Sequence, residues 1–201
     1  MTPNYLIFGQ LRREYLLPPA GPARLDVAGG SPLYVAAGLR VWESGVGLVG
    51  RVGNDFPRAW LNDCMAHGLD TSGIKILEEN LDARDFLAYT ESFELSRINP
   101  VSQFARREMT FPKSLLCYQP DKPLDEALRL SVTDIPADYL NARAAYLCPM
   151  NLMTQAQMLA ALKRGTTHTF ILDPAPASMT PTVRRELPLI HGVTAFITSQ
   201  E

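Results

Sequence analysis

The sequence predicts a three-layer α/β/α domain with a mostly parallel central sheet. Short apolar runs of strand type alternate with helical stretches over much of the chain, a pattern that favours a parallel sheet covered by helices. A glycine pair, Gly29-Gly30, stands directly before one of these helices. The length of 201 residues and the hydrophobic fraction of 46% suit one domain, or most of a larger one, with a filled core.

The first third of the chain contains two strand–helix repeats. Ser31 and Pro32 suit a helix start, and Gly68 suits a helix end. The residues expected in the strands and helices are 5–9 (strand), 31–41 (helix), 46–52 (strand) and from Asn54 or Asp55 to His67 (helix).

The middle of the chain differs from both ends. It mixes β-forming fragments with charged residues and carries few helix signals, so we expect two segments, 13–27 and 84–111, to form a small β lid inserted in a single α/β domain. The alternating pattern then returns, and the expected elements are 144–148 (strand), 153–164 (helix), 169–173 (strand), 180–187 (helix) and 193–197 (strand).

Charge and cysteine content exclude several functions. The net charge of −2 and the pI of about 5.9 give no indication of nucleic-acid or membrane binding. The three cysteines are far apart and form no Cys-x-x-Cys pair, so neither a disulfide framework nor a metal site is expected. The sequence shows no secretory signal and no apolar run long enough to span a membrane, and we expect a cytoplasmic protein.

Gly29-Gly30 is the most informative short motif. Without a Cβ, a glycine lets a ligand approach the backbone, and the free amides at a helix start favour hydroxyl groups or anions. A second glycine pattern, from Gly45 to Gly50, matches the Gly-x-Gly-x-x-Gly of dinucleotide-binding proteins. However, it runs into a strand instead of opening a helix, so a nicotinamide cofactor is not expected.

The order of motifs resembles the N-terminal two-thirds of the ribokinase-like (PfkB) carbohydrate kinases. The matching segments are Gly29-Gly30 with its small-residue helix, Gly50-Arg51-Val52-Gly53-Asn54-Asp55, Gly68-Leu69-Asp70-Thr71 and Phe170-Ile171-Leu172-Asp173-Pro174-Ala175-Pro176-Ala177. The resemblance implies a ribokinase-like fold. It also implies an ATP- and Mg²⁺-dependent kinase that phosphorylates a hydroxyl group of a sugar or nucleoside.

The resemblance also assigns the acceptor side. Glu14 takes the place of the family's sugar-binding Asp; the alternative is a surface acid. Gly29 and Gly30 would present backbone to the substrate. Tyr34 stands where relatives often carry Asn, and either contacts the substrate ring or packs on the sheet. Arg107 lies in the expected lid, where it would approach the substrate.

The phosphoryl-donor side is represented by two residues. Asp173 ends the strand of the Asp-Pro-Ala-Pro-Ala motif, and Ser199 stands at the Asn of the family's Asn-x-x-Glu. The sequence contains no Gly-x-Gly-Asp, so the catalytic Asp would lie beyond residue 201 and the chain alone is predicted to be inactive. The alternative is a non-catalytic sugar-binding or regulatory relative. An apolar lid face would favour a homodimer through the lid.

Overall fold

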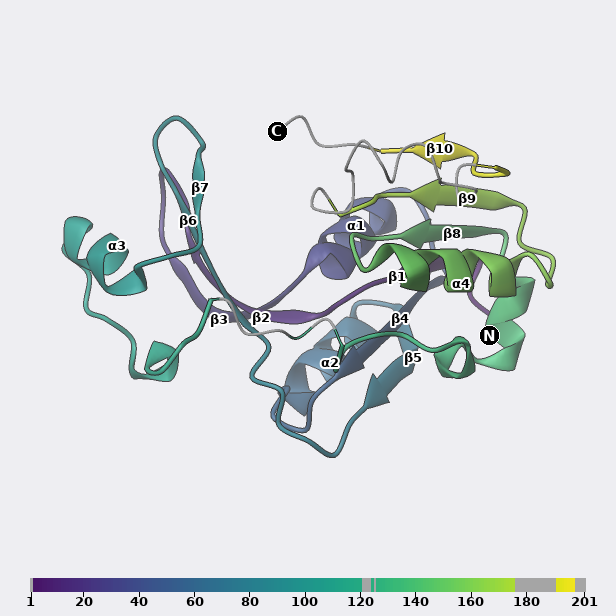
Figure 1. Cartoon of the computed structure of the whole chain (residues 1–201), viewed down its shortest axis with the longest axis horizontal. Coiled ribbons are helices and arrows are strands. Elements are labelled where there is room, and N and C mark those ends of the chain that lie inside the picture. Colours follow the sequence, from purple (N-terminus) through teal and green to yellow (C-terminus); the bar gives the residue numbers. More distant parts are fainter. Residues whose placement is uncertain (1, 121–123, 125, 176–190, 198–201) are drawn as a thin grey trace.

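The computed structural model describes residues 2–120, 124, 126–175 and 191–197, and shows two β-sheets (Figure 1). The larger sheet has the strand order β10-β9-β8-β1-β4-β5, and every neighbouring pair in it is parallel. The smaller sheet has the order β3-β2-β6-β7. The predicted α/β architecture with a mostly parallel central sheet is therefore confirmed.

The elements have the following bounds. The larger sheet consists of β1 (Tyr5–Phe8), β4 (Val46–Val52), β5 (Leu69–Ile76), β8 (Ala144–Leu147), β9 (Thr169–Leu172) and β10 (Ala195–Phe196). The smaller sheet consists of β2 (Arg12–Leu17), β3 (Arg24–Gly29), β6 (Arg84–Tyr89) and β7 (Leu95–Ser96). The α-helices are α1 (Ser31–Arg40), α2 (Arg58–Ala66), α3 (Pro100–Arg106) and α4 (Leu152–Leu162), and the 3₁₀ helices are η1 (Lys113–Leu115), η2 (Val132–Asp134) and η3 (Ala137–Asn141).

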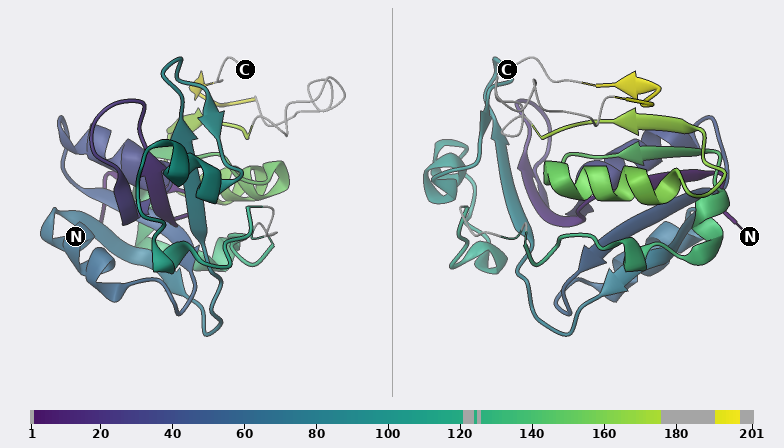
Figure 2. Two further views of the ribbon diagram at one scale, coloured as in Figure 1. Left: turned by 90° about the vertical axis from the view of Figure 1, so that its left-hand side faces the viewer. Right: turned by 45° about the vertical axis from the view of Figure 1, so that its right-hand side comes forward.

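Alternation along β1 produces the three layers. Leu6 and Phe8 point to one face, where they join a buried cluster with residues of α4. Ile7 points to the opposite face and packs in a second cluster with residues of α1 and α2. Figure 2 shows α4 on the opposite side of the sheet from α1 and α2. Because both faces of the strand are buried, β1 is apolar along its whole length, as expected of a central parallel strand.

The sequence analysis missed one strand of the larger sheet. Residues 69–76 form β5 at the edge of the sheet, directly after α2. Its polar residues and Gly73 produce no apolar run, because only Gly73 and Ile74 in this strand are buried. Asp55 does not cap α2. Its carboxylate instead accepts hydrogen bonds from the backbone amides of Leu81 and Asp82, both at 2.9 Å.

The smaller sheet is covered on one face by the segment that follows it. Tyr15 and Phe86 point to this face and pack with Phe104 of α3 and Leu115 of η1, all of them buried. The hydroxyl of Tyr15 donates a hydrogen bond to the carbonyl of Ser114 at 3.2 Å. The covering segment is thus bound to the sheet by apolar packing and by hydrogen bonds.

The two expected lid segments do meet in the smaller sheet, but the expectation for 84–111 was only partly right. Residues 84–89 and 95–96 are strands, whereas 100–106 form a helix and 108–111 form no strand. The apolar face of the lid, expected to be open, is covered by α3 and η1 because the chain folds back over it. The helix expected at 180–187 lies outside the described residues.

Strand order places a ligand-binding position next to β1. From β1 the chain proceeds to β4 and β5 on one side, and later to β8, β9 and β10 on the other. In open α/β sheets, ligands bind at the carboxyl ends of the strands where the order reverses in this way. In this chain that position lies between the ends of β1 and β8, next to the smaller sheet (Figure 1).

Candidate acceptor site

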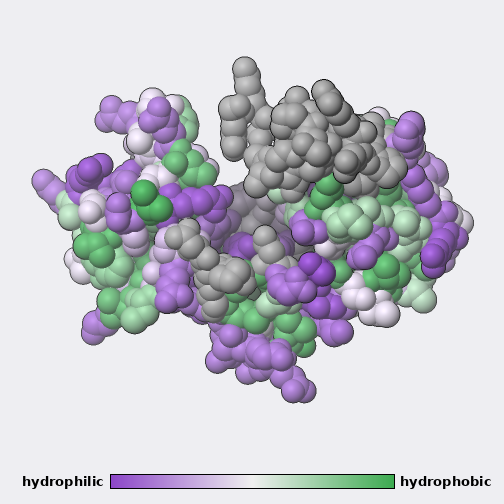
Figure 3. Space-filling model, viewed as in Figure 1, coloured by the Kyte–Doolittle hydropathy of each residue, from purple (hydrophilic) through white to green (hydrophobic). Residues whose placement is uncertain are grey.

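A polar pocket of about 340 Å³ lies between the two sheets, at the carboxyl ends of β1 and β8. Figure 3 shows the surface hollowed between the two sheets, with hydrophilic residues exposed there. The pocket is lined by Gln10, Arg12, Glu14, Gly30, Ser31, Tyr34, Asp85, Leu87, Tyr89, Arg97 and Pro149. The lining comes from the end of β1, the start of α1, strands β2 and β6, and the loops after β7 and β8.

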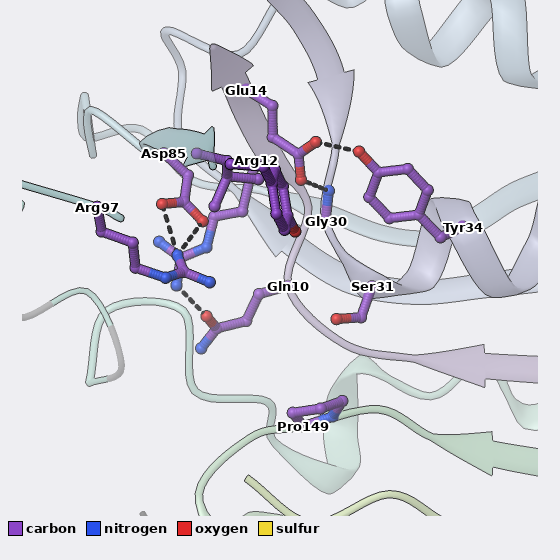
Figure 4. A pocket seen from close by; sticks show the side chains of 11 residues that line it. Gln10, Arg12, Glu14, Gly30, Ser31, Tyr34, Asp85, Arg97 and Pro149 are labelled. Atoms are coloured by element: carbon purple, nitrogen blue, oxygen red, sulfur yellow. Dashed lines mark hydrogen bonds and ion pairs between the residues drawn. The ribbon is translucent and has the colours of Figure 1, made fainter. Parts of the chain in front are cut away.

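Glu14 is the buried carboxylate of this pocket. Glu14 is only 3% exposed. One carboxylate oxygen accepts a hydrogen bond from the backbone amide of Gly30 at 2.6 Å, and the other accepts one from the hydroxyl of Tyr34 (Figure 4). Because a buried charge needs such partners, Glu14 is an integral part of the site and not the surface acid of the alternative interpretation.

The glycine pair is required by the position of Glu14. A Cβ on Gly29 would collide with the Glu14 carboxylate, and a Cβ on Gly30 would collide with the backbone carbonyl of Gln10. Gly30 also has φ = 97°, a value that residues with a side chain rarely adopt. The pair therefore allows the chain to pass from β3 into α1 directly against the carboxylate, with the start of α1 facing the pocket.

Tyr34 faces the pocket and does not pack on the sheet. Tyr34 is 56% exposed, and its hydroxyl donates a hydrogen bond to Glu14 from the first turn of α1. Burial of the phenol hydroxyl and its hydrogen bond to the carboxylate raise the pKa of Tyr34 above its ordinary value. The hydroxyl therefore stays protonated and remains a donor to Glu14 at neutral pH.

The second sheet contributes an ion pair that the sequence analysis missed. Nη1 of Arg97 lies 2.7 and 2.6 Å from the two carboxylate oxygens of Asp85. Arg12 donates to the amide oxygen of Gln10 beside this pair (Figure 4). The wall of the pocket on this side is completed by Leu87 and Tyr89.

Arg107 does not line the pocket. Its guanidinium donates to the backbone carbonyl of Tyr89 at 2.7 Å and to the side chain of Gln103 at 3.0 Å. These bonds connect the end of α3 to the end of β6, so the structure places Arg107 behind the pocket wall. In the described residues, the basic side chains that line the pocket are Arg12 and Arg97.

Asp173 lies after β9, outside the pocket. Its carboxylate accepts a hydrogen bond from the hydroxyl of Tyr146 at 3.1 Å, and partial burial raises its pKa above the ordinary value of an aspartate. The fully buried Gln155 donates its amide to the carbonyls of Cys148 (2.9 Å) and Asp173 (2.7 Å), which fixes the ends of β8 and β9 relative to each other. Ser199 lies outside the described residues.

The side-chain alternation of a β-strand relates three of the missed lining residues to one another. Asp85, Leu87 and Tyr89 occupy every second position of β6, and therefore share one face of the sheet. The sequence does not reveal that β6 pairs with β2, because more than sixty residues separate the two strands. Without that pairing, no sequence pattern places Asp85 beside Glu14.

In the part of the chain that the structure describes, no group of three or more His, Cys, Asp or Glu side chains is arranged to hold a metal ion. Within the same residues, no helix is both long and apolar enough to cross a membrane.

Comparison with solved structures identifies the architecture. A putative ribokinase II from E. coli, solved with ATP and Mg²⁺, superimposes with a TM-score of 0.64 at 16% identity over 98% of this chain. A PfkB protein from Polaromonas sp. JS666 gives a TM-score of 0.62 at 18% identity, again over 98% of this chain. The chain has the ribokinase-like fold. The resemblance inferred from the motifs is thus confirmed at the level of the fold.

Sequence comparison gives weaker similarity to the same kind of protein. A cytidine kinase from Thermococcus kodakarensis is 24% identical over 166 residues, which are 80% of this chain and 48% of the kinase. No protein-family model matches the chain. The chain spans about half the length of that kinase, and 62% and 65% of the ribokinase II and PfkB structures.

Proposed function

We propose that this ribokinase-like chain is the acceptor-binding part of an ATP-dependent kinase that phosphorylates a hydroxyl group of a carbohydrate or nucleoside. The observation that carries the proposal is the meeting of Glu14 with the Gly29-Gly30 backbone in a polar pocket at the carboxyl ends of β1 and β8. A buried carboxylate and bare backbone suit an uncharged polyol, because carboxylate oxygens accept hydrogen bonds from hydroxyl groups. The names of the similar proteins, a cytidine kinase and a sugar kinase among them, support this acceptor class.

The chain's own residues account for binding and orientation of the acceptor. Glu14 would fix the acceptor hydroxyls, Tyr34 would hold Glu14 in place, and the start of α1 would border the reacting end of the pocket. Holding the acceptor in one orientation is a major part of phosphoryl-transfer catalysis, since the protein does little covalent chemistry in that reaction. ATP and Mg²⁺ would supply the phosphoryl group and neutralise its charge.

The remaining catalytic groups are proposed to lie outside these 201 residues. The sequence contains no Gly-x-Gly-Asp motif to provide an anion hole and a general base. Asp173, which follows β9, is proposed to lie on the phosphate side of the site. Ser199 is assigned to the same side by the motif resemblance alone. A cytoplasmic location, where ATP is available, belongs to the same proposal, and the three free cysteines agree with a reducing compartment.

The proposal is tested by separating binding from turnover. Isothermal titration calorimetry of the 201-residue chain should show binding of cytidine or D-ribose, and the Glu14→Ala variant should lose this binding. A coupled assay with ATP and Mg²⁺ should show no phosphorylation by this chain. Binding of neither compound would reject the acceptor site, and turnover by the 201 residues would reject the assignment of the catalytic groups.

The alternative, a non-catalytic sugar-binding or regulatory relative, predicts the same binding. The gene sequence downstream of codon 201 distinguishes the two functions. A Gly-x-Gly-Asp followed by a helical segment supports the kinase, and its absence supports the binding protein. A homodimer formed through the smaller sheet also remains a proposal. Since α3 and η1 cover one face of that sheet, such a dimer would use its edge strands β3 or β7.

A further inference from the structure

Strand register places two carboxylates side by side in the pocket. In the parallel pair of β2 and β6, Glu14 is aligned with Asp85, so both side chains leave the same face of the smaller sheet. Neighbouring strands lie only about 4.8 Å apart. Both residues line the pocket. The pocket therefore contains a pair of adjacent acidic groups where the sequence analysis expected one.

Each carboxylate has its own compensating partners. The Glu14 carboxylate is stabilised by hydrogen bonds from the Gly30 amide and the Tyr34 hydroxyl, whereas Asp85 forms an ion pair with Arg97. The side chain of Asp85 is 20% exposed and that of Arg97 is 53% exposed. Because Arg97 directly follows β7, the ion pair connects the end of the β6–β7 hairpin to the pocket-facing side of the sheet.

We propose that Asp85 is a second residue that accepts hydrogen bonds from the hydroxyl groups of the acceptor, and that Arg97 is the residue that positions it. An ionised carboxylate only accepts hydrogen bonds, and two adjacent acceptors match two neighbouring hydroxyls of a sugar ring. A phosphate group placed here would face both carboxylates. Of the two arginines that line the pocket within the described residues, Arg97 would have to leave Asp85 and Arg12 would have to leave Gln10 to bind it. The pocket therefore selects a neutral polyol, such as free ribose or the ribose of a nucleoside, over a phosphorylated sugar. This inference rests on the proposed function.

The first test measures the affinity of the 201-residue chain for D-ribose, cytidine and ribose 5-phosphate by isothermal titration calorimetry at neutral pH. The variant Asp85→Asn keeps the shape of the side chain but removes its charge. We expect it to bind ribose and cytidine about tenfold to 100-fold more weakly, the usual effect of losing hydrogen bonds to a charged group. Wild-type protein should bind ribose 5-phosphate more weakly than ribose.

A matched control comes from the same sheet. Asp26 pairs with Arg13 at 2.9 Å, and neither residue lines the pocket. Asp26→Asn breaks another Arg–Asp ion pair of the smaller sheet and should leave the affinity for ribose and cytidine unchanged. Melting curves of both variants establish that they are folded at the titration temperature.

The positioning role of Arg97 is tested with variants that do not disturb a buried core, since this side chain is exposed. Arg97→Gln should weaken ribose binding, and Arg97→Lys should restore part of it. If Arg97 acts through Asp85, the double variant Asp85→Asn/Arg97→Gln should bind as weakly as Asp85→Asn alone. Additive losses would show that Arg97 acts independently of Asp85 and would overturn the positioning role.

The remaining outcomes separate this inference from the function on which it rests. If wild-type protein binds ribose or cytidine and Asp85→Asn binds equally well, the role of Asp85 is wrong and the proposed function stands. If wild-type protein binds neither compound, both are wrong. Binding of ribose 5-phosphate as tight as that of ribose, or tighter, would overturn the selection of a neutral acceptor.

Discussion

The two sheets of this molecule differ in what their faces contact. The central strands β1 and β4 of the six-stranded sheet are covered on both faces, by α4 on one and by α1 and α2 on the other. The four-stranded sheet buries one face against α3 and η1, and its other face lines the polar pocket. The two sheets therefore have different roles. The parallel sheet fixes the backbone around the pocket through packing, while the smaller sheet supplies charged side chains to the pocket.

The largest expected loss of stability tests whether the smaller sheet can unfold while the larger sheet stays folded. Phe104 is 1% exposed, and its ring lies 6.1 Å from that of Phe86 and 5.4 Å from that of Phe111. Phe104→Ala should destabilise the smaller sheet by about 4 kcal/mol through the cavity that it leaves. Hydrogen exchange should show lost protection in β2 and β6, with β1 and β8 still protected.

The matched change in the parallel sheet is Leu147→Ala, at a side chain with 0% exposure. It should cost about 3 kcal/mol and lower the protection of both sheets, because the smaller sheet rests on the larger one. Equal loss of protection in both sheets after Phe104→Ala would contradict the comparison, since the molecule would then unfold as one unit.

The next effect concerns a buried charge at the parallel sheet. The Asp134 side chain is 0% exposed and pairs with Arg51 of β4 at 2.6 Å and with Lys75 of β5 at 3.4 Å. Burial by itself raises the pKa of Asp134, but the hydrogen bonds from Arg51 and from the Ser131 amide hold it below its ordinary value. Asp134→Asn should cost about 3 kcal/mol at neutral pH, because Arg51 loses its partner.

The pH dependence of this effect follows from the lowered pKa. A carboxylate with a lowered pKa stabilises the fold above its unfolded pKa of about 4, and that stability is lost as the pH falls through the folded value. The difference in unfolding free energy between wild type and Asp134→Asn should therefore shrink below about pH 4. Denaturant titrations at several pH values measure it, and a difference that stays constant into acid would argue against the ion pair.

A smaller effect is expected at the junction of the two sheets. Tyr34→Phe removes the hydroxyl that donates to Glu14 and leaves a buried carboxylate oxygen short of one partner. We expect a loss of about 1–2 kcal/mol in stability and weaker binding of ribose. Since the pKa of Tyr34 is raised, this hydrogen bond is fully present below about pH 10, and the stability difference should be constant between about pH 6 and 9.

The control for Tyr34→Phe lies at the end of the parallel sheet. Tyr146 also donates its hydroxyl to a carboxylate, that of Asp173, but neither residue lines the acceptor pocket. Tyr146→Phe should therefore leave ribose binding unchanged. Equal losses of ribose affinity in the two variants would mean that the acceptor site extends to the end of β9.

The smallest effect is expected at the rim of the smaller sheet. The Arg13–Asp26 pair is well aligned, but its side chains are 20% and 30% exposed. Asp26→Asn should cost at most about 1 kcal/mol, because water screens such a pair and asparagine tolerates the φ of 55° at this position. Thermal unfolding measures the difference, and a loss above about 2 kcal/mol would show that the pair is part of the folded core.

Local sequence patterns were sufficient to predict most of the parallel sheet and part of the pocket. In strands such as Val46–Val52 every residue but Arg51 is buried, so their apolar runs predict them without knowledge of any partner. Gly29-Gly30 predicted a close approach of backbone, and the structure places the Glu14 carboxylate there. These features are local, and a local pattern of residues is sufficient to specify them.

The rest of the pocket depends on contacts between segments that are distant in the sequence. Asp85 lies beside Glu14 because β6 pairs with β2 in one particular register, and a shift by a single residue would turn Asp85 to the opposite face. Arg97 reaches Asp85 from the end of β7. Arg107 was expected in the site, but the helix α3 carries it behind β6. The edge strand β5 was missed for a related reason, since solvent on its exposed side removes the apolar run. Pairing between distant segments leaves no local pattern in the sequence, because its free energy comes from contacts formed only when the chain is folded.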